Sequence, residues 1–174
     1  FEQESSGRFL LMSDAGLLPY PTLEQRVQII ENAVDAARSF GVAEPRVACL
    51  SSSEEVDPRI PCSVDAARLT EMNQAGGELA GCGHVSGPMD LGSAVDPASA
   101  ALKGIGGEVA GRADVLHCPD VVAGNLIGKA LIYFAGPIYV AGAVVGGAVP
   151  IVLLSRASPA THKYYSILLA LACA

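Results

Sequence analysis

The sequence predicts a three-layer α/β sandwich in which helices cover both faces of a mainly parallel sheet. Apolar runs of five or six residues alternate along the 174-residue chain with segments in which apolar residues recur at helical spacing. Nineteen glycines and eleven prolines supply the frequent turns that such an alternation needs. Sheets of this kind bind ligands at the carboxyl ends of their strands, so the residues that follow each expected strand are candidates for a site.

Five apolar runs bounded by turn residues are the expected strands. They span residues 8–13, 46–51, 79–84, 114–118 and 149–154. Two glycines weaken the run at 79–84. The run at 149–154, with the sequence VPIVLL, is the most strand-like of all.

The most clearly marked helix follows Thr22. Thr22 and Gln25 form a T-x-x-Q capping box, in which each side chain satisfies a free amide at the start of a helix. Apolar residues then recur at steps of three and four as far as Ala37, and Gly41 is a natural stop. Further helices are expected at 63–75, with Val64, Ala67 and Met72 facing the core, at 97–103, at 125–135 and from Ser158-Pro159 onward.

The composition excludes several classes of protein. Hydrophobic residues make up 51% of the chain and charged residues only 17%, which argues against disorder. The net charge is −7 and the eleven Lys and Arg residues are scattered singly, which argues against a nucleic-acid binder. Residues 130–155 carry no charge, but glycines and prolines interrupt this run. It is therefore interpreted as a helix end, a turn and buried strands rather than as a membrane helix.

The five cysteines are odd in number and widely spaced, with no CxxC pair. This pattern predicts free thiols rather than disulfides or zinc ligands, and a cytoplasmic location. His84 and His117 lie in apolar runs without partners at metal-binding spacing, so we interpret them as packed side chains and expect no metal site. A glycine-rich stretch at 104–111 lacks the GxGxxG order of a nucleotide loop.

Several motifs, in a single order along the chain, carry a family resemblance. They are SDA at 13–15, LEQ at 23–25, GP at 87–88, EVAG at 108–111, ADVL at 113–116, AGN at 123–125, YFA at 133–135 and VVGGAVPIVLLSRA at 144–157. Together these motifs resemble the phosphotransacetylase/phosphate butyryltransferase family, and its butyryltransferase branch in particular. Enzymes of this family pass an acyl group between phosphate and coenzyme A.

The resemblance implies an isocitrate/isopropylmalate dehydrogenase-like architecture of two α/β domains with the active site in the cleft between them. Residues 1–145 would form the second domain. Residues 146–174 would supply a strand and a helix to a first domain whose main part lies outside this chain. The start at Phe1 rather than at Met fits a fragment or a processed form of a longer protein. The resemblance also implies a homodimer formed through the second domain.

The pair Ser155-Arg156 is the expected catalytic centre. It ends an apolar run and stands three residues before a helix start, where backbone amides, the helix dipole and the planar Arg fork suit an anion. On the residues alone, a capping turn with a solvated Arg is the alternative. The resemblance places the catalytic Ser-Arg pair of the family here. The implied reaction is direct attack of the coenzyme A thiolate on an acyl phosphate, without a covalent enzyme intermediate and without a cofactor.

The remaining candidates concern proton transfer and substrate contact. His162 stands where acetyltransferase members carry an Asp after the Ser-Arg pair; it is either a base that works near neutral pH or a surface residue. The expected substrate contacts are Asp14, Asn125, Lys129 and Tyr133. Asp14 has loop anchoring as its alternative role, Asn125 has helix capping, and Lys129 has simple solvation.

The chain departs from the family pattern at 86–92. The DGPLALD motif of the family appears as SGPMDLG, which loses both outer acids at Ser86 and Gly92. This departure keeps a second hypothesis open, namely a non-catalytic relative or an isolated domain that dimerises or binds coenzyme A. A third hypothesis is another enzyme of the same broad fold, but the SRA turn at 155–157 argues against it.

Overall fold

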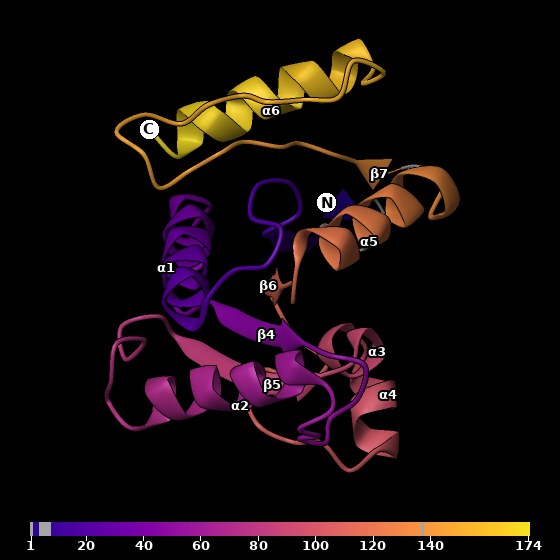
Figure 1. Cartoon of the computed structure of the whole chain (residues 1–174). Coiled ribbons are helices and arrows are strands. Elements are labelled where there is room, and N and C mark those ends of the chain that lie inside the picture. The colour runs from indigo at the N-terminus through magenta and orange to yellow at the C-terminus, as the bar shows by residue number, and fades with distance from the viewer. Residues whose placement is uncertain (1, 4–7, 137) are drawn as a thin grey trace.

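The computed structural model describes residues 2–3, 8–136 and 138–174 and shows an α/β architecture (Figure 1). The main sheet has four parallel strands in the order β3 (Leu11–Ser13), β6 (Val115–His117), β4 (Arg46–Leu50) and β5 (His84–Met89). The predicted fold class, with its mainly parallel sheet, is therefore confirmed. The isocitrate/isopropylmalate dehydrogenase-like arrangement stays a prediction.

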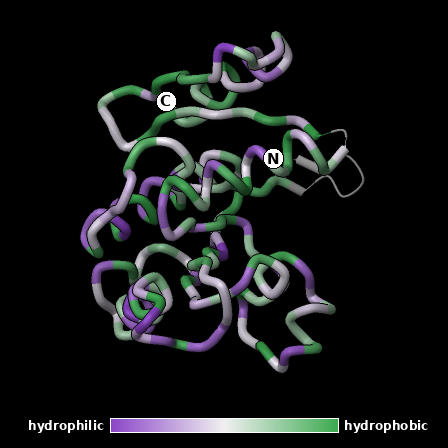
Figure 2. Tube along the Cα trace, turned by 45° about the vertical axis from the view of Figure 1, so that its right-hand side comes forward, coloured by the Kyte–Doolittle hydropathy of each residue, from purple (hydrophilic) through white to green (hydrophobic). Residues whose placement is uncertain are grey.

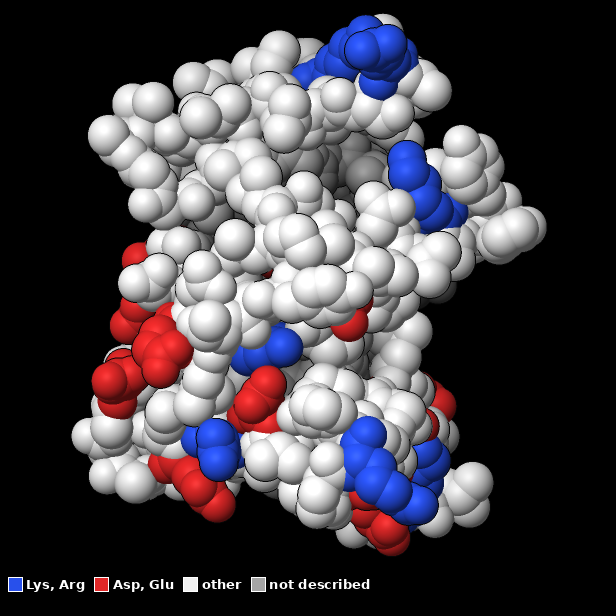
Figure 3. Space-filling model, in the orientation of Figure 1, with Lys and Arg blue, Asp and Glu red and all other residues white. Residues whose placement is uncertain are grey.

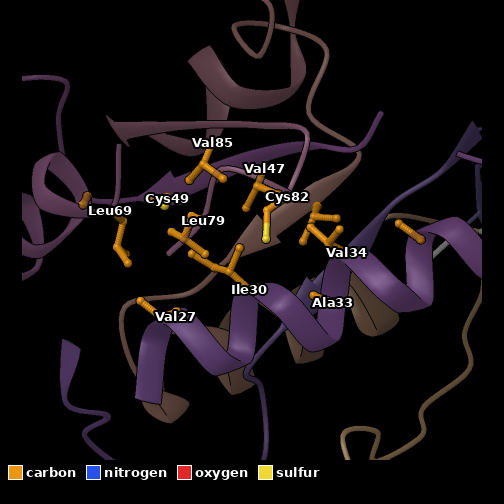
Figure 4. Close-up of a cluster of buried hydrophobic side chains, with 13 residues drawn as sticks. Val27, Ile30, Ala33, Val34, Val47, Cys49, Leu69, Leu79, Cys82 and Val85 are labelled. Carbon is orange, nitrogen blue, oxygen red and sulfur yellow. The ribbon is translucent and has the colours of Figure 1, made fainter. Parts of the chain in front are cut away.

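Helices lie on both faces of the main sheet. The described helices are α1 (Leu23–Ser39), α2 (Pro61–Gln74), α3 (Leu91–Val95), α4 (Pro97–Leu102), α5 (Val121–Phe134) and α6 (Ala160–Ala172). Val47 and Cys49 of β4 pack into a core formed with α1 and α2 (Figure 4). Ala48 and Leu50 point to the other face and pack with α3 and α4. Burial on both faces explains why the strands are continuous apolar runs rather than alternating ones.

α1 begins where the sequence predicts. The Oγ1 atom of Thr22 accepts a hydrogen bond from the Gln25 amide at 3.3 Å, and Oε1 of Gln25 accepts one from the Thr22 amide at 2.9 Å. Both halves of the capping box are therefore present. The apolar face of the helix is buried as far as Ala37, and Gly41 follows the C-cap with a φ of 83°.

The run at 8–13 serves two sheets rather than one. Its second half is β3 of the main sheet. Its first half, β2 (Arg8–Phe9), belongs to a small antiparallel sheet with β1 (Glu2–Gln3) and β7 (Ile138–Tyr139). The single strand predicted over 8–13 is therefore wrong in extent, because the pairing partners that divide it lie elsewhere in the sequence.

The strand predicted at 79–84 is misplaced. Residues 79–83 form turns, and β5 begins only after them. Asn73 of α2 organises these turns, since its side-chain amide donates hydrogen bonds to the carbonyl of Leu79 at 2.7 Å and to that of Gly83 at 3.1 Å. A side chain thus occupies carbonyls that a strand would use in its ladder.

α2 lies close to the predicted range, but another of its faces is buried. The buried residues are Ser63, Ala66 and Leu69. Of the residues predicted to face the core, Val64 and Ala67 are only partly buried, whereas Met72, also partly buried, packs against the core as predicted. A buried serine is tolerated here because Ser63 Oγ donates to the carbonyl of Ile60 at 2.8 Å, which satisfies the hydroxyl within its own turn.

The two C-terminal helices begin at other residues than predicted. α5 begins at Val121 rather than at 125, because Asp120 caps it and accepts a hydrogen bond from the Ala123 amide at 2.8 Å. α6 begins at Ala160 with Pro159 in the N-cap position, so Ser158 does not cap it.

The strand predicted at 149–154 is not formed in the described part of the chain. The segment makes a single antiparallel bridge there, between Ile151 and Val144. A strand depends on a neighbour for its backbone hydrogen bonds, and the described residues bring no further strand to this segment.

Two expectations about buried and apolar residues can be compared with the structure. The five cysteines are free thiols, as predicted, and Cys49, Cys82 and Cys118 are buried. His117 is buried as expected, whereas His84 is exposed at the start of β5, so its interpretation as a packed residue is wrong.

Within the described ranges, no helix combines the length and the apolar character needed to cross a membrane.

Candidate active site

A cavity of about 730 Å³ opens between α1, α5, the loop that follows β3 and the extended segment 141–145. Figure 3 shows a hollow in the upper part of this face of the molecule. The cavity lies at the carboxyl end of β3, which is where a parallel sheet is expected to bind a ligand. Three of the predicted substrate contacts line it together: Asp14, Asn125 and Lys129.

Asp14 anchors the loop that forms one wall of the cavity. Its carboxylate accepts hydrogen bonds from the amides of Gly16 at 2.8 Å, Leu17 at 3.0 Å and Leu18 at 2.8 Å. Both carboxylate oxygens are therefore engaged by the backbone. This geometry favours the loop-anchoring role over direct contact with a ligand.

Gly124 sets the distance between α5 and this loop. A Cβ atom on Gly124 would lie 2.7 Å from the carbonyl oxygen of Asp14 and 2.9 Å from Cα of Ala15. The helix can approach the loop so closely only because residue 124 has no side chain. As a result, Asn125, which follows Gly124 directly, and Lys129 in the next turn of α5 both reach the cavity.

Asn125 and Lys129 lie one helical turn apart and offer an amide and a positive charge to the cavity. Because Asp120 caps α5, the interpretation of Asn125 as the helix cap is wrong. Lys129 is exposed, and it forms no ion pair with any other residue that the structure describes. Both side chains are thus free to contact a ligand.

One face of α1 contributes polar residues that the sequence analysis did not single out. Gln25, Gln28, Ile29 and Asn32 line the cavity at the i, i+3, i+4 and i+7 spacing of a single helix face. In the sequence, these three polar residues recur at helical spacing beside the apolar residues of the core, and that recurrence was the available signal. The pattern of apolar residues alone, however, does not show that such a face borders a cavity.

The extended segment 141–145 forms the opposite wall and is held from two sides. The amide of Gly142 donates to Ser166 Oγ at 2.9 Å, and that hydroxyl donates to the carbonyl of His162 at 2.7 Å. On the other side, a Cβ atom on Gly146 would lie 2.3 Å from the side-chain nitrogen of Asn32. The wall therefore rests on both α1 and α6.

Ser155 and Arg156 do not line the cavity in the described structure. Both are exposed in the turn that precedes α6, next to the lining residue Leu153. The hydroxyl of Ser155 accepts a hydrogen bond from the Ala157 amide at 3.4 Å, and its carbonyl accepts one from the Ser158 amide at 3.0 Å. The pair thus lies in an exposed turn, as the alternative expected, but this turn does not cap α6, whose N-cap Pro159 has no side-chain hydrogen bond. The catalytic role stays a prediction.

His162 and Tyr133 also lie outside the group that the cavity brings together. His162 is half-buried in the first turn of α6, where its carbonyl accepts a hydrogen bond from the same Ser166 hydroxyl that accepts from the Gly142 amide. Tyr133 is 71% exposed, and its neighbour Ile132 lines the cavity instead. The expected roles of both side chains stay predictions.

Acidic and basic residues are unevenly distributed along the chain. Residues 121–174 contain Lys129, Arg156 and Lys163 but no Asp or Glu, whereas all 18 acidic residues lie in the first 120 positions. Figure 3 accordingly shows the acidic side chains over the lower part of this face and only basic ones over its upper part. Within the cavity lining the charged residues are Lys129 and Asp14, and the Asp14 carboxylate is already hydrogen-bonded to three backbone amides, so Lys129 is the charge that remains available to an anionic ligand.

The altered motif at 86–92 lies outside the cavity. Asp90 caps α3 through the Ser93 amide at 2.6 Å and forms an ion pair with Lys103, which also contacts Glu54 at 2.7 Å. The hydrogen bond from Lys103 lowers the pKa of Asp90 to about 2. The motif therefore spans the end of β5 and the start of α3, which meet at the salt-bridged Asp90, and neither Ser86 nor Gly92 borders the cavity described here.

Comparisons with known proteins agree on a single family. Residues 1–171 match the phosphate acetyl/butaryl transferase family. A phosphate acetyltransferase of Thermotoga maritima is 44% identical over 93% of this chain and 54% of its own length, and a probable phosphate butyryltransferase of Bacillus subtilis is 41% identical over 98% of this chain and 56% of its own.

Solved structures show the same fold. A branched-chain phosphotransacylase from Enterococcus faecalis superposes with a TM-score of 0.85 at 31% identity, covering 97% of this chain and 59% of that protein. A phosphotransacetylase from Streptococcus pyogenes, at 23% identity and a TM-score of 0.75, supports the fold alone, over 98% of this chain and 51% of that protein. The chain spans only about half the length of the relatives that it matches. On this evidence, the chain belongs to the phosphate acetyl/butaryl transferase family.

Proposed function

We propose that the protein containing this chain is a phosphate acyltransferase, which transfers an acetyl, butyryl or related acyl group between phosphate and coenzyme A. The observation that carries the proposal is the cavity at the carboxyl end of β3. It presents Asn125 and Lys129 without a free carboxylate, in a chain whose relatives are named phosphate acetyl- and butyryltransferases. Such a cavity suits the phosphate groups of both substrates.

The proposed reaction is a direct transfer. The thiolate sulfur of coenzyme A attacks the carbonyl carbon of the acyl phosphate, a carbon–sulfur bond forms, and the carbon–oxygen bond to phosphate breaks. Phosphate leaves with the bonding electron pair, and Arg156 offsets the charge that develops on it. His162 accepts the thiol proton, and Ser155 orients the reacting carbonyl. Neither a metal nor a redox cofactor takes part.

Within this scheme Lys129 and Asn125 bind phosphate oxygens of coenzyme A or of the acyl phosphate. Asp14 supports them indirectly, because the loop that it anchors is the surface on which α5 packs. Tyr133 is assigned to the outer part of the substrate site.

The two-domain organisation belongs to the same proposal. Residues 1–145 form the second domain, and residues 146–174 pack on a first domain supplied by the rest of the protein. Figure 2 shows the extended segment before α6 as largely hydrophobic. Along it and along α6, apolar side chains such as Leu153 and Leu171 are more than 60% exposed in the described structure. Apolar side chains of this kind are normally covered, and the relatives are long enough to supply the cover.

We also propose that the protein is a cytoplasmic homodimer formed through the second domain. The free thiols favour the cytoplasm. The outer face of α5, with Val122, Leu126 and Phe134 exposed, offers an apolar surface to a second copy. Sedimentation of the full-length protein as a monomer at micromolar concentration would contradict the dimer.

The deciding experiment measures loss of free thiol when the full-length protein is mixed with coenzyme A and an acyl phosphate. We expect thioester and phosphate to form in equal amounts. Binding of coenzyme A without transfer from acetyl, butyryl or isobutyryl phosphate would show instead that the protein is a non-catalytic relative.

A further inference from the structure

Two polar side chains are buried beside the main core without the hydrogen bonds that they need. His117 of β6 is 2% exposed, and neither of its ring nitrogens has a hydrogen-bond partner among the residues that the structure describes. Arg26 of α1 is 7% exposed. Its Nε atom lies 3.3 Å from Asp65 Oδ2, an ion-pair distance, but makes no hydrogen bond with any described residue. Buried nitrogens are almost always hydrogen-bonded, because one without a partner destabilises the fold.

The sheet brings these two side chains together at its carboxyl end. His117 is paired with Ser13 of β3 on one side and with Cys49 of β4 on the other. Side chains of paired residues project to the same face, and Cys49 belongs to the core that α1 and α2 cover (Figure 4). Burial lowers the pKa of His117, the charge of Arg26 adds to this effect, and the charge of Asp14 opposes it. Arg26, in the first turn of α1, therefore lies close to His117.

The charges of this group favour a neutral ligand. Asp65 compensates the charge of Arg26, and His117 is uncharged at neutral pH because burial and Arg26 lower its pKa to about 3. An anion would add an uncompensated charge close to Asp14, and a cation would be repelled by Arg26. The missing partner must instead be a small neutral molecule that both donates and accepts hydrogen bonds. Water has these properties, and buried waters typically bond to about three otherwise unsatisfied polar groups.

We propose that Arg26, His117 and Ser13 bind one ordered water molecule, which joins α1 to the floor of the cavity. The Nε–H group of Arg26 donates to the water, and the water donates to the unprotonated ring nitrogen of His117. Ser13, beside His117 in the ladder, supplies the third contact. Because Ser13 also lines the cavity, the water lies directly beneath the cavity floor. The site accounts for a histidine in a strand whose other residues, Val115 and Leu116, are apolar.

The direct test is a crystal structure of the full-length protein at neutral pH, at a resolution that shows ordered solvent. We expect one water within hydrogen-bonding distance of both Arg26 Nε and a ring nitrogen of His117. Direct hydrogen bonds from Arg26 Nε to Asp65 and from His117 to the backbone, with no solvent between the two side chains, would overturn the proposal. Crystals grown with bromide would show by anomalous scattering whether an anion occupies the site, and bromide there would equally overturn it.

A double-mutant cycle tests the same site in solution. In Arg26→Met or His117→Leu alone the water loses a partner, so the second substitution should then have a smaller effect. The folding equilibrium constant of the double variant should exceed the value expected from independent effects by about fivefold or more, as measured by urea titration. Independent effects of the two substitutions would contradict a shared water.

The matched control is a second cycle that combines Arg26→Met with His84→Leu, because His84 is exposed at the start of β5. Its two effects should be independent. His117→Gln, whose side-chain amide can still bond to the water, should reduce the folding equilibrium constant less than His117→Leu. Equal losses in these two variants would count against a hydrogen-bonding role for His117. None of these measurements uses a substrate, so failure of the proposed acyl transfer would leave the water site standing, and the reverse also holds.

Discussion

The guanidinium of Arg46 donates two hydrogen bonds of 2.8 Å each to the carboxylate of Asp114. The backbone amides of the two residues form two further hydrogen bonds between them. The Arg46 amide donates to Asp114 Oδ2 at 3.0 Å, and the Asp114 amide donates to the Arg46 carbonyl at 2.8 Å. The pair joins the start of β4 to the residue before β6, and the Asp114 carbonyl accepts from Leu11 of β3 at 2.9 Å. The hydrogen bond with Asp114 raises the pKa of Arg46. Three neighbouring strands are thus aligned at the amino-terminal end of the sheet.

The first prediction is that Asp114→Ala lowers the free energy of unfolding by about 2 kcal/mol, since it removes a charged bidentate hydrogen bond and leaves Arg46 half-buried without its partner. Urea titration would measure the change. Arg59→Ala is the control, because Arg59 pairs with Asp57 while itself largely exposed, and its loss should change the free energy of unfolding far less than the loss of Asp114. Equal effects of the two variants would contradict the alignment role of Asp114.

The second prediction concerns Gly124, where α5 meets the Asp14 loop. Alanine favours a helix over glycine by about 1 kcal/mol, so Gly124→Ala would be stabilising if the site were open. The added Cβ would instead lie 2.7 Å from a backbone carbonyl oxygen. We therefore expect a net loss of about 1–3 kcal/mol, together with weaker binding of coenzyme A as Asn125 and Lys129 move.

Gly106→Ala is the matched control for that substitution. A Cβ atom on Gly106 meets nothing within 4 Å, so its stability should stay close to that of the wild type. Thermal melts and titration calorimetry with coenzyme A would check both variants. A Gly124→Ala protein as stable as the control, with unchanged binding, would show that α5 can shift without cost.

The third prediction is that His117 makes the fold sensitive to acid. Burial, with the charge of Arg26 adding to it and the backbone of Ser13 opposing it, lowers the pKa of His117 from 6.5 to about 3. Between these two values the unfolded chain binds a proton that the folded chain does not. The free energy of unfolding therefore falls with decreasing pH, by up to about 1.4 kcal/mol per pH unit, and the effect is absent above the unfolded pKa.

His117→Leu should flatten this dependence between pH 6 and pH 4, as followed by urea midpoints at several pH values. A remaining slope is expected from carboxylates such as Asp90, whose pKa is held at about 2 by Lys103 and whose contribution is also lost as the pH falls. His84→Gln, at an exposed position, should keep the wild-type slope. An unchanged slope in His117→Leu would assign the acid sensitivity to the carboxylates alone.

Local patterns predicted those elements whose causes are local. The Thr22 and Gln25 pair marked the start of α1 because a capping box is complete within four residues. β4 was predicted because burial on both faces makes its whole length apolar. The strand at 79–84 was wrong because the side chain of Asn73 bonds the carbonyls of Leu79 and Gly83. The strand at 149–154 was wrong because partners distant in sequence decide whether an apolar run enters a ladder.

The candidate site shows the same division. Motif resemblance selected Asp14, Asn125 and Lys129, which the structure brings to one cavity. The resemblance could not show that three backbone amides donate hydrogen bonds to the Asp14 carboxylate. It also could not show that Gln28 and Asn32 of α1 line the cavity. Those facts follow from how α1 and α5 pack around the loop after β3. The motif resemblance assigns Ser155 and Arg156 to catalysis, whereas the described geometry places both in an exposed turn outside the cavity.

The fourth prediction therefore concerns Arg156. If its guanidinium holds the departing phosphate, its charge matters most where negative charge develops during the transfer. Arg156→Ala in the full-length protein should then lower kcat by about 10²- to 10³-fold, as loss of an oxyanion donor does. Arg156→Lys should recover only part of this, because an ammonium group cannot reproduce the two parallel hydrogen bonds of a guanidinium.

The melting temperature should barely change in either variant, since Arg156 is exposed in a turn and forms no ion pair with any residue that the structure describes. Lys163→Ala is the control, because it removes another exposed positive charge close to the start of α6 but outside the Ser-Arg turn. Thiol loss with butyryl phosphate and coenzyme A, measured beside thermal melts, separates the possible roles. Near-normal turnover in Arg156→Ala would show that this segment is an exposed turn without a catalytic role. Parallel losses of activity and melting temperature would indicate a structural role, and equal losses in Lys163→Ala would indicate that only the summed positive charge matters.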